Sequence, residues 1–293
     1  MLLILALLLS QAPPATEVYM AALSRDAVPH VSGPVVNVSG NAGYDNQPSF
    51  TPDGRVVLFT SNRDGRETDI YRYDLATRVL TQLTHTAESE YSPIVTPDGR
   101  TFSVVRVEAD STQRLWRFDL DGSNPRLVLE NVKPVGYHVW LGATHLGLFI
   151  LGAGREPATL QLVDTSTGTA QVVDTAIGRS LLLRPGTSTM SYVSTPPGAT
   201  STVKTFDPAT RAIATLTDTL PGSQDCAWDP ASGWLLMASG AKIYGWAPGR
   251  SGWTEIGDLA SAGIDRITRL AVNPDPTADP SRRLAIVGEP ARR

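Results

Sequence analysis

Apolar and polar residues alternate with a period of two along much of this chain, in short segments that are separated by turns. This alternation is typical of a β-strand that buries one face more deeply than the other. Clear examples run over residues 68–75 and 113–120, and the segments 56–63 and 101–108 are also strand-like. Helical periodicity nowhere extends beyond about two turns. The pattern therefore predicts an all-β protein.

The strand pattern repeats along the chain. The pentapeptide TPDGR occurs at residues 51–55 and again at 96–100, and each copy precedes two alternating segments, a polar turn and a short apolar segment. The repeat can be followed by the aspartate that ends the third segment, with spacings of 45, 45 and 43 residues between Asp74, Asp119, Asp164 and Asp207. A unit of four short strands, repeated every ~40 to 50 residues, is typical of a β-propeller blade.

The last blade is divided between the two ends of the chain. A sixth unit begins over residues 267–290 and contains two strands, whereas residues 16–23 and 34–40 match a third and a fourth strand. Together the four segments make one blade, and a ring closed in this way leaves no open sheet edge between first and last blades. The sequence predicts a six-bladed β-propeller of four-stranded blades, with residues 16–293 as one domain.

The first two repeats also resemble a known motif. NQPSFTPDGRVVLFTSNRDGRETDIYRYDL at residues 46–75, followed by SPIVTPDGR at 92–100, is similar to the WD40-like Pro-Asp-Gly repeat of TolB-type six-bladed propellers. The later blades match by strand pattern and spacing. The resemblance covers the propeller alone, because TolB carries a separate N-terminal α/β domain for which this chain has no room. The resemblance implies the fold but does not single out one function. This repeat also occurs in propellers attached to peptidases and in stand-alone binding proteins.

The TPDGR motif has an explanation in backbone geometry. Proline presets φ at the second position of a type I turn, and glycine adopts the left-handed conformation that closes the hairpin. The alternative, a calcium loop, needs several oxygen ligands at alternate positions and a distal glutamate, whereas Asp53 and Asp98 each stand alone. We therefore expect residues 51–55 and 96–100 to form the first hairpin turn of their blades.

The first 15 residues, MLLILALLLSQAPPA, begin with nine apolar positions. This run is too short for a transmembrane helix, which needs roughly 20 residues, and is typical of a secretory signal peptide that ends in small residues. A buried strand and a misplaced start codon are the alternatives. We expect a periplasmic or secreted monomer without a membrane span. With 29 acidic and 25 basic residues, the formal charge of −4 argues against a nucleic-acid partner.

Polar residues recur at equivalent points of the repeat, just before each inner strand. Equivalent points of five blades are marked by prolines, and counting strands gives the equivalent point of the third blade. The prolines are Pro52, Pro97, Pro185, Pro230 and Pro274. This alignment places the polar positions around one mouth of the central channel, where we expect a ligand or partner to bind. The candidate residues are Asp45, Glu90, Tyr91, Tyr137, His138, Arg179, Asp225 and Arg269.

This polar ring has three interpretations. Its carboxylates and histidine suit a divalent cation in the central channel, with Glu90, His138 and Asp225 as the candidate ligands. Its arginines suit a carboxylate or phosphate, and the side chains can also satisfy one another. The sequence has no nucleophile elbow, zinc-protease, Walker or Rossmann motif. We therefore expect a non-catalytic scaffold for a protein partner or small ligand; the alternative is a polysaccharide lyase or hydrolase that uses a metal held by the ring.

Overall fold

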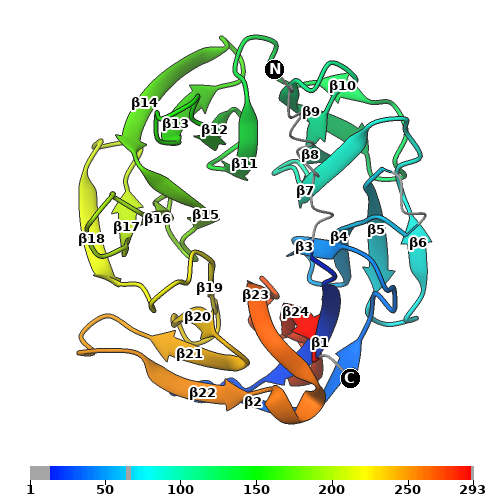
Figure 1. Ribbon diagram of the computed structural model, residues 1–293, viewed down its shortest axis with the longest axis vertical. Helices are drawn as coiled ribbons and strands as arrows, with labels where there is room; N and C mark the ends of the chain where they lie inside the picture. The colour runs from blue at the N-terminus through cyan, green and yellow to red at the C-terminus, as the bar shows by residue number, and fades with distance from the viewer. Residues whose placement is uncertain (1–13, 64–66, 292–293) are drawn as a thin grey trace, which may run out of the picture.

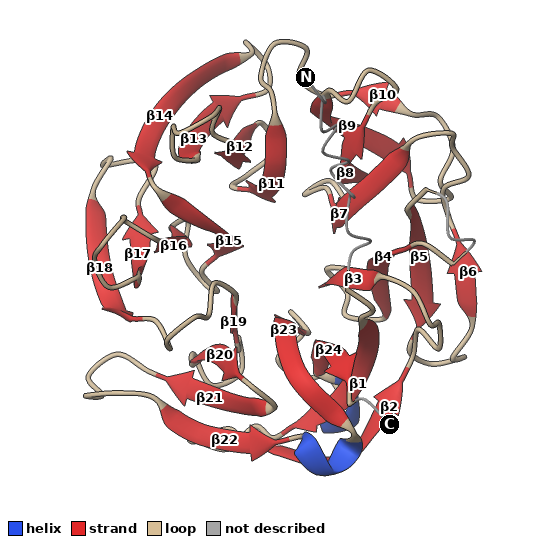
Figure 2. Ribbon diagram, in the orientation of Figure 1, coloured by secondary structure: helices blue, strands red, loops and turns tan. Residues whose placement is uncertain are grey.

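The computed structural model describes residues 14–63 and 67–291, which form a ring of six four-stranded antiparallel sheets (Figure 1; Figure 2). In each sheet the strand nearest the centre pairs with the next strand outward, and so on to the rim. Apart from residues 14 and 15, the predicted signal segment lies outside the described residues. Within the described ranges, no helix has the length and apolar character needed to cross a membrane.

Five of the blades are continuous in sequence within the described chain. Blade I contains β3 (Asp45–Phe50), β4 (Val56–Ser61), β5 (Asp69–Asp74) and β6 (Leu80–Gln82). Blade II contains β7 (Ser89–Val95), β8 (Thr101–Val107), β9 (Gln113–Asp119) and β10 (Arg126–Leu127). Blade III contains β11 (Val135–Trp140), β12 (His145–Ile150), β13 (Thr159–Asp164) and β14 (Thr169–Thr175). Blade IV contains β15 (Ile177–Leu183), β16 (Met190–Ser194), β17 (Thr202–Phe206) and β18 (Ile213–Asp218). Blade V contains β19 (Cys226–Trp228), β20 (Leu235–Ser239), β21 (Lys242–Trp246) and β22 (Thr254–Asp258).

Blade VI is built from both ends of the chain, as the sequence predicts. Its strand order is β2-β1-β24-β23, and β1 pairs antiparallel with β24, so that Val18 lies opposite Val287. The strands are β23 (Ile264–Val272), β24 (Leu284–Pro290), β1 (Glu17–Leu23) and β2 (Val31–Asn37), accompanied by the short 3₁₀ helices η1 (Ala260–Ala262) and η2 (Pro280–Arg282). The prediction of a six-bladed all-β propeller with a shared last blade is confirmed.

The hydrophobic core lies between the blades. Because side chains alternate across a strand, β1 sends Val18 and Met20 into a cluster with blade I. Tyr19 and Ala21 of the same strand enter a cluster with blade V. The other hydrophobic clusters of the described chain likewise join consecutive blades. Each sheet thus buries both faces against its neighbours, so the position of every blade depends on the two beside it.

The TPDGR turns have the predicted geometry. Gly54 and Gly99 have φ of +66° and +67°, and their amides donate to the carbonyls of Thr51 and Thr96 at 2.8 and 2.9 Å. In the first turn, one carboxylate oxygen of Asp53 accepts a hydrogen bond from the Thr51 hydroxyl at 2.6 Å. The same oxygen accepts the Arg55 amide at 3.2 Å. The motif therefore stabilises its own hairpin.

Two buried polar side chains fasten blade VI to its neighbours. Asn273 donates from Nδ2 to the carbonyl of Gly54, in blade I, at 2.8 Å. Arg283 is fully buried and pairs with Asp229 of blade V. Its Nη1 also donates to the carbonyl of Leu23, at the end of β1, at 3.0 Å. These contacts hold the divided blade from both sides.

The two TPDGR turns provide a matched test of this closure. A Cβ at Gly54 would lie 2.1 Å from Oδ1 of Asn273, whereas a Cβ at Gly99 would meet no atom within 4 Å. Both alanine variants take on the strain of a left-handed backbone, about 1–2 kcal/mol. Gly54→Ala must also displace Asn273 from buried hydrogen bonds, which costs about 1–3 kcal/mol more. Denaturant unfolding should show this additional loss for Gly54→Ala, and equal losses in the two variants would contradict the role of Asn273.

Candidate functional site

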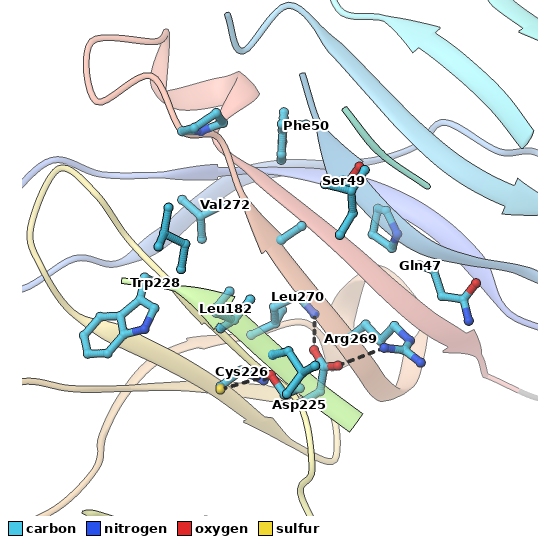
Figure 3. A pocket seen from close by; sticks show the side chains of 18 of the residues that line it. Gln47, Ser49, Phe50, Leu182, Asp225, Cys226, Trp228, Arg269, Leu270 and Val272 are labelled. Carbon is cyan, nitrogen blue, oxygen red and sulfur yellow. Dashed lines mark hydrogen bonds and ion pairs between the residues drawn. The ribbon is translucent and has the colours of Figure 1, made fainter. Parts of the chain in front are cut away.

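Two cavities meet at the centre of the ring and together form the central channel. The larger cavity, about 550 Å³, opens toward the ends of the inner strands β15, β19 and β23 and the turns that follow them (Figure 3). The smaller cavity, about 480 Å³, lies toward the beginnings of the inner strands. Tyr137, Arg179 and Arg269 line both cavities and thus form the boundary between them.

Arg269 on β23 is the most connected residue at this boundary. Its Nη1 lies 3.1 Å from Oδ2 of Asp225, and its Nη2 donates to the hydroxyl of Tyr137 at 2.8 Å. The other carboxylate oxygen of Asp225 accepts the backbone amide of Leu270 at 3.2 Å. These bonds tie blade III and the start of blade V to blade VI at the channel.

Arg179 on β15 adds a fourth blade to this group. Its Nη2 donates to the carbonyl of Thr268 at 2.7 Å, and its Nε lies 3.8 Å from Oδ2 of Asp225. The side chain of Arg179 is 33% exposed, against 11% for Arg269. We call Tyr137, Arg179, Asp225 and Arg269 the channel cluster; all four are residues that the sequence predicted to lie at the channel.

The channel is cationic although the protein as a whole is acidic. The described lining of the larger cavity contains three arginines and one acidic residue. These are Arg179, Arg184, Arg269 and Asp225. In the described lining of the smaller cavity, Arg266 joins the two shared arginines, and Glu289 is the acidic residue. The lining of these cavities therefore has a charge opposite in sign to that of the whole chain, which carries −4.

Tyr44 is a channel residue that the sequence analysis missed. It lines the smaller cavity, and burial raises the pKa of its phenol to about 12, an effect that Arg269 opposes and that Tyr137 and Tyr91 reinforce. The hydroxyl therefore stays protonated and neutral near pH 7. The sequence offers one indication of this role, namely that Tyr44 directly precedes the candidate Asp45. Residues 44 and 46 line the cavity, while residue 45 does not.

Asp45 lies away from both cavities. It is fully buried at the start of β3, opposite Ser61 of β4. Burial raises the pKa of its carboxyl, and Ser61, Ser39 and Arg63 oppose that rise. Asp45 therefore belongs to a polar group inside the sheets, where an incoming ligand does not reach it.

Glu90 occupies the equivalent position in blade II and is also fully buried. One carboxylate oxygen accepts the Thr86 hydroxyl at 2.6 Å and lies 3.1 Å from Nε of Arg106. Burial nevertheless raises the pKa of Glu90 to about 7. The next residue, Tyr91, lies near Tyr44, and its phenol helps to raise the pKa of the Tyr44 phenol.

His138 lies in the wall of the larger cavity but faces blade II. Its Nε2 is 2.7 Å from the hydroxyl of Ser103, which donates to the carbonyl of Ile94 at 3.1 Å and accepts Nε1 of Trp140 at 2.9 Å. Because the single hydroxyl proton is already used, Nε2 of His138 must donate. Burial lowers the pKa of His138 to about 3, so the imidazole is neutral at physiological pH.

The three candidate metal ligands do not come together. Glu90 is held by Thr86 and Arg106, His138 by Ser103, and Asp225 by Arg269. Across residues 14–63 and 67–291, no group of three or more His, Cys, Asp or Glu side chains is placed to hold a metal ion. The described residues thus do not fit the divalent cation of the metal hypothesis.

Solved structures of other proteins share the fold of this chain. No protein-family model matches the sequence. A putative TolB from Agrobacterium tumefaciens is 14% identical with a TM-score of 0.69, and the match covers 94% of this chain and 98% of that one. For TolB from Acinetobacter baumannii the identity is 14% and the TM-score 0.62, over 97% of this chain and 68% of that one. This chain has a TolB-like propeller fold.

The TolB-like fold does not by itself decide the function. A gluconolactonase from Xanthomonas campestris is 10% identical to this chain, with a TM-score of 0.62 over 96% of this chain and 99% of that one. The same architecture therefore supports an enzyme as well as TolB proteins, and function has to be argued from the site.

The buried Glu90 predicts a specific pH dependence of stability in this TolB-like propeller. Its folded pKa of about 7 lies above its ordinary value of 4.5. Between these pH values the folded protein keeps a proton that the unfolded chain releases, so the free energy of unfolding falls as the pH rises. Each unit of pKa shift corresponds to about 1.4 kcal/mol.

Glu90→Gln should remove this part of the pH dependence, because the amide does not titrate. Unfolding free energies measured between pH 4.5 and 7.5 test this, with Glu156→Gln, at an exposed glutamate, as the control substitution. A Glu90→Gln profile parallel to that of the wild type would show that Glu90 is not protonated in the folded state.

Proposed function

We propose that this TolB-like propeller is an exported, monomeric, non-catalytic scaffold that holds a protein partner or a small ligand in its central channel. The observation that carries the proposal is the channel cluster, which four blades supply at the boundary between two cavities. Arg269 is held on two sides, by Asp225 and Tyr137. Arg179 is more exposed and offers its guanidinium to the channel. Strands that hold a cation in this way preorganise it for binding.

The remaining titratable groups favour binding over catalysis. General acid–base catalysis needs a group of suitable pKa within reach of the substrate. His138 is buried and neutral, and Glu90, whose pKa is about 7, does not line either cavity. Burial also raises the pKa of the Cys226 thiol to about 12, which suppresses the nucleophilic thiolate. Burial raises the pKa of the Asp225 carboxyl in the described channel lining, but its oxygens are engaged by Arg269 and by the Leu270 amide, a role that suits recognition.

Three further features support the proposed class of ligand and the proposed compartment. The larger cavity, at about 550 Å³, has the size of a site for a small molecule or for one side chain of a partner. The acidic chain as a whole, with its charge of −4, disfavours nucleic acid. The apolar run at the N-terminus, followed by small residues, supports export.

A photo-crosslinking experiment tests the proposal. Leu183 lines the larger cavity and is 44% exposed, whereas Val172 is 56% exposed on β14, at the rim of blade III. A benzophenone amino acid at position 183, irradiated in the native host, should form a discrete adduct that position 172 does not form. Adding Arg179→Gln should reduce that adduct at least about fivefold, because a charge-assisted hydrogen bond is lost.

Two results would contradict this proposal. The first is an adduct that forms equally at position 172, which would place binding outside the channel, or one at position 183 that is insensitive to Arg179→Gln, which would exclude the channel cluster from binding. The second is conversion of the captured molecule into a product by the purified wild-type protein, which would establish catalysis. The mass of the adduct distinguishes a protein partner from a small ligand.

A further inference from the structure

The larger cavity has two chemically different ends. Asp225 and Arg269 lie toward one side of it, while Trp228, Val272 and Phe50 lie toward the other (Figure 3). On β23, Val272 follows Arg269 by three residues, and Trp228 of β19 likewise follows Asp225 by three. Three residues of a strand span about 10 Å. A ligand that fills the cavity therefore meets charge at one end and apolar side chains at the other.

The charged end carries more positive than negative charge. Arg269 lies 3.1 Å and Arg179 3.8 Å from the same oxygen of Asp225, so two guanidinium groups share one carboxylate. Burial and the charge of Arg269 both lower the pKa of Arg179, which shows that the two cations repel each other. Arginine remains protonated nonetheless, and an anion placed beside Arg179 would relieve this repulsion.

The apolar end adds one more cation at its edge. Arg184, in the turn after β15, has its guanidinium 5.4 Å from the ring centre of Trp228. It lines the larger cavity with Leu182 and Leu183, beside Trp228. The apolar wall thus has a positive edge and no described acidic side chain, so an anionic molecule meets a favourable field along the whole cavity.

Three other ligand classes fit this cavity less well. A metal ion would be repelled by the arginines. A neutral apolar molecule would remove water from Arg179 without giving it an acceptor, and leaving a charged donor without a partner is costly. Inorganic phosphate would satisfy the arginines but would leave the half-buried side chains of Phe50 and Val272 in contact with water.

We infer that the larger cavity binds a small organic carboxylate, with its carboxylate on Arg179 and its apolar body along Trp228, Val272 and Phe50. The inference rests on the proposed function and specifies the chemistry of the ligand at that site. A planar carboxylate matches the two parallel donors of a guanidinium group. The distance between the two ends suits an acid whose apolar body extends several carbon atoms from the carboxylate.

Two isosteric probes test the inference by calorimetric titration. 4-Phenylbutanoate should bind the full-length protein at least about tenfold more tightly than the neutral 4-phenylbutanamide. Arg179→Gln should weaken the acid about tenfold or more and change the amide by less than about twofold, since only the acid forms a charge-assisted pair. Arg126→Gln is the matched control. Arg126 is an exposed arginine of the outermost strand of blade II and pairs with Asp119. This variant should leave both affinities unchanged.

Several outcomes would overturn the inference. These are equal affinity for acid and amide, failure of the acid to bind at millimolar concentration, or an unchanged affinity for the acid in a folded Arg179→Gln protein. If Arg179→Gln does not fold, the ratio of acid to amide affinity in the wild type, and its reduction by Arg184→Gln at the cavity edge, decide the matter.

The failure of this inference can be separated from the failure of the proposed function. If the amide binds as well as the acid, and the crosslink at position 183 still depends on Arg179, the channel remains the binding site and only the carboxylate assignment is wrong. If a peptide with a free C-terminal Leu-Phe binds at least about tenfold more tightly than 4-phenylbutanoate, and its C-terminal amide does not bind, the site recognises protein termini rather than small acids.

Discussion

The structure depends on the closure of blade VI, whose strands come from opposite ends of the chain. Pairing of β1 with β24 joins the two halves, the Arg283–Asp229 ion pair fixes them to blade V, and Asn273 fixes them to the first turn of blade I. Removing one partner of a fully buried ion pair leaves an uncompensated charge, which is strongly destabilising. Because β23 carries Arg269, closure of the ring also determines where the channel cluster forms.

Closure of the ring brings positive charge together in the channel. The blades pack through apolar layers that bury both faces of each sheet, so polar side chains of the inner strands that do not fit these layers turn toward the channel or toward buried partners. At the channel, Arg179 and Arg269 share Asp225, and this shortage of negative charge occurs in a protein of charge −4. A low-dielectric wall around such a pair strengthens its attraction for an anion.

The sequence predicted the fold well and placed some of the candidate residues correctly at the channel, where their role in binding stays a prediction. The TPDGR turns mark blades I and II, and the regular aspartate spacing marks blades I to IV. Strand pattern extends the repeat to blades V and VI, so the divided blade can be recognised without knowing any long-range contact. The same alignment identified Tyr137, Arg179, Asp225 and Arg269, because equivalent positions in a ring must converge.

The sequence was less successful in predicting which side chains of a strand point into the channel, because a shift of one residue in register moves a side chain to the opposite face of the sheet. Asp45 and Glu90 were chosen from polar windows, but side chains alternate across a strand, and both enter the interior of the sheets while Tyr44 lines the channel. The metal hypothesis failed for a related reason. Whether His138 faces the channel or Ser103 depends on a rotamer and on a contact with another blade, which spacing along one chain does not reveal.

We propose that the closed ring presents the guanidinium group of Arg179, which shares Asp225 with Arg269, to an anionic ligand in the channel. A crystal structure of the protein with 4-phenylbutanoate tests it most directly. We expect density for the carboxylate within hydrogen-bonding distance of Arg179, at the boundary between the cavities, with the phenyl ring beside Trp228. The acid bound outside the larger cavity, or Arg179 turned away from it, would contradict this proposal.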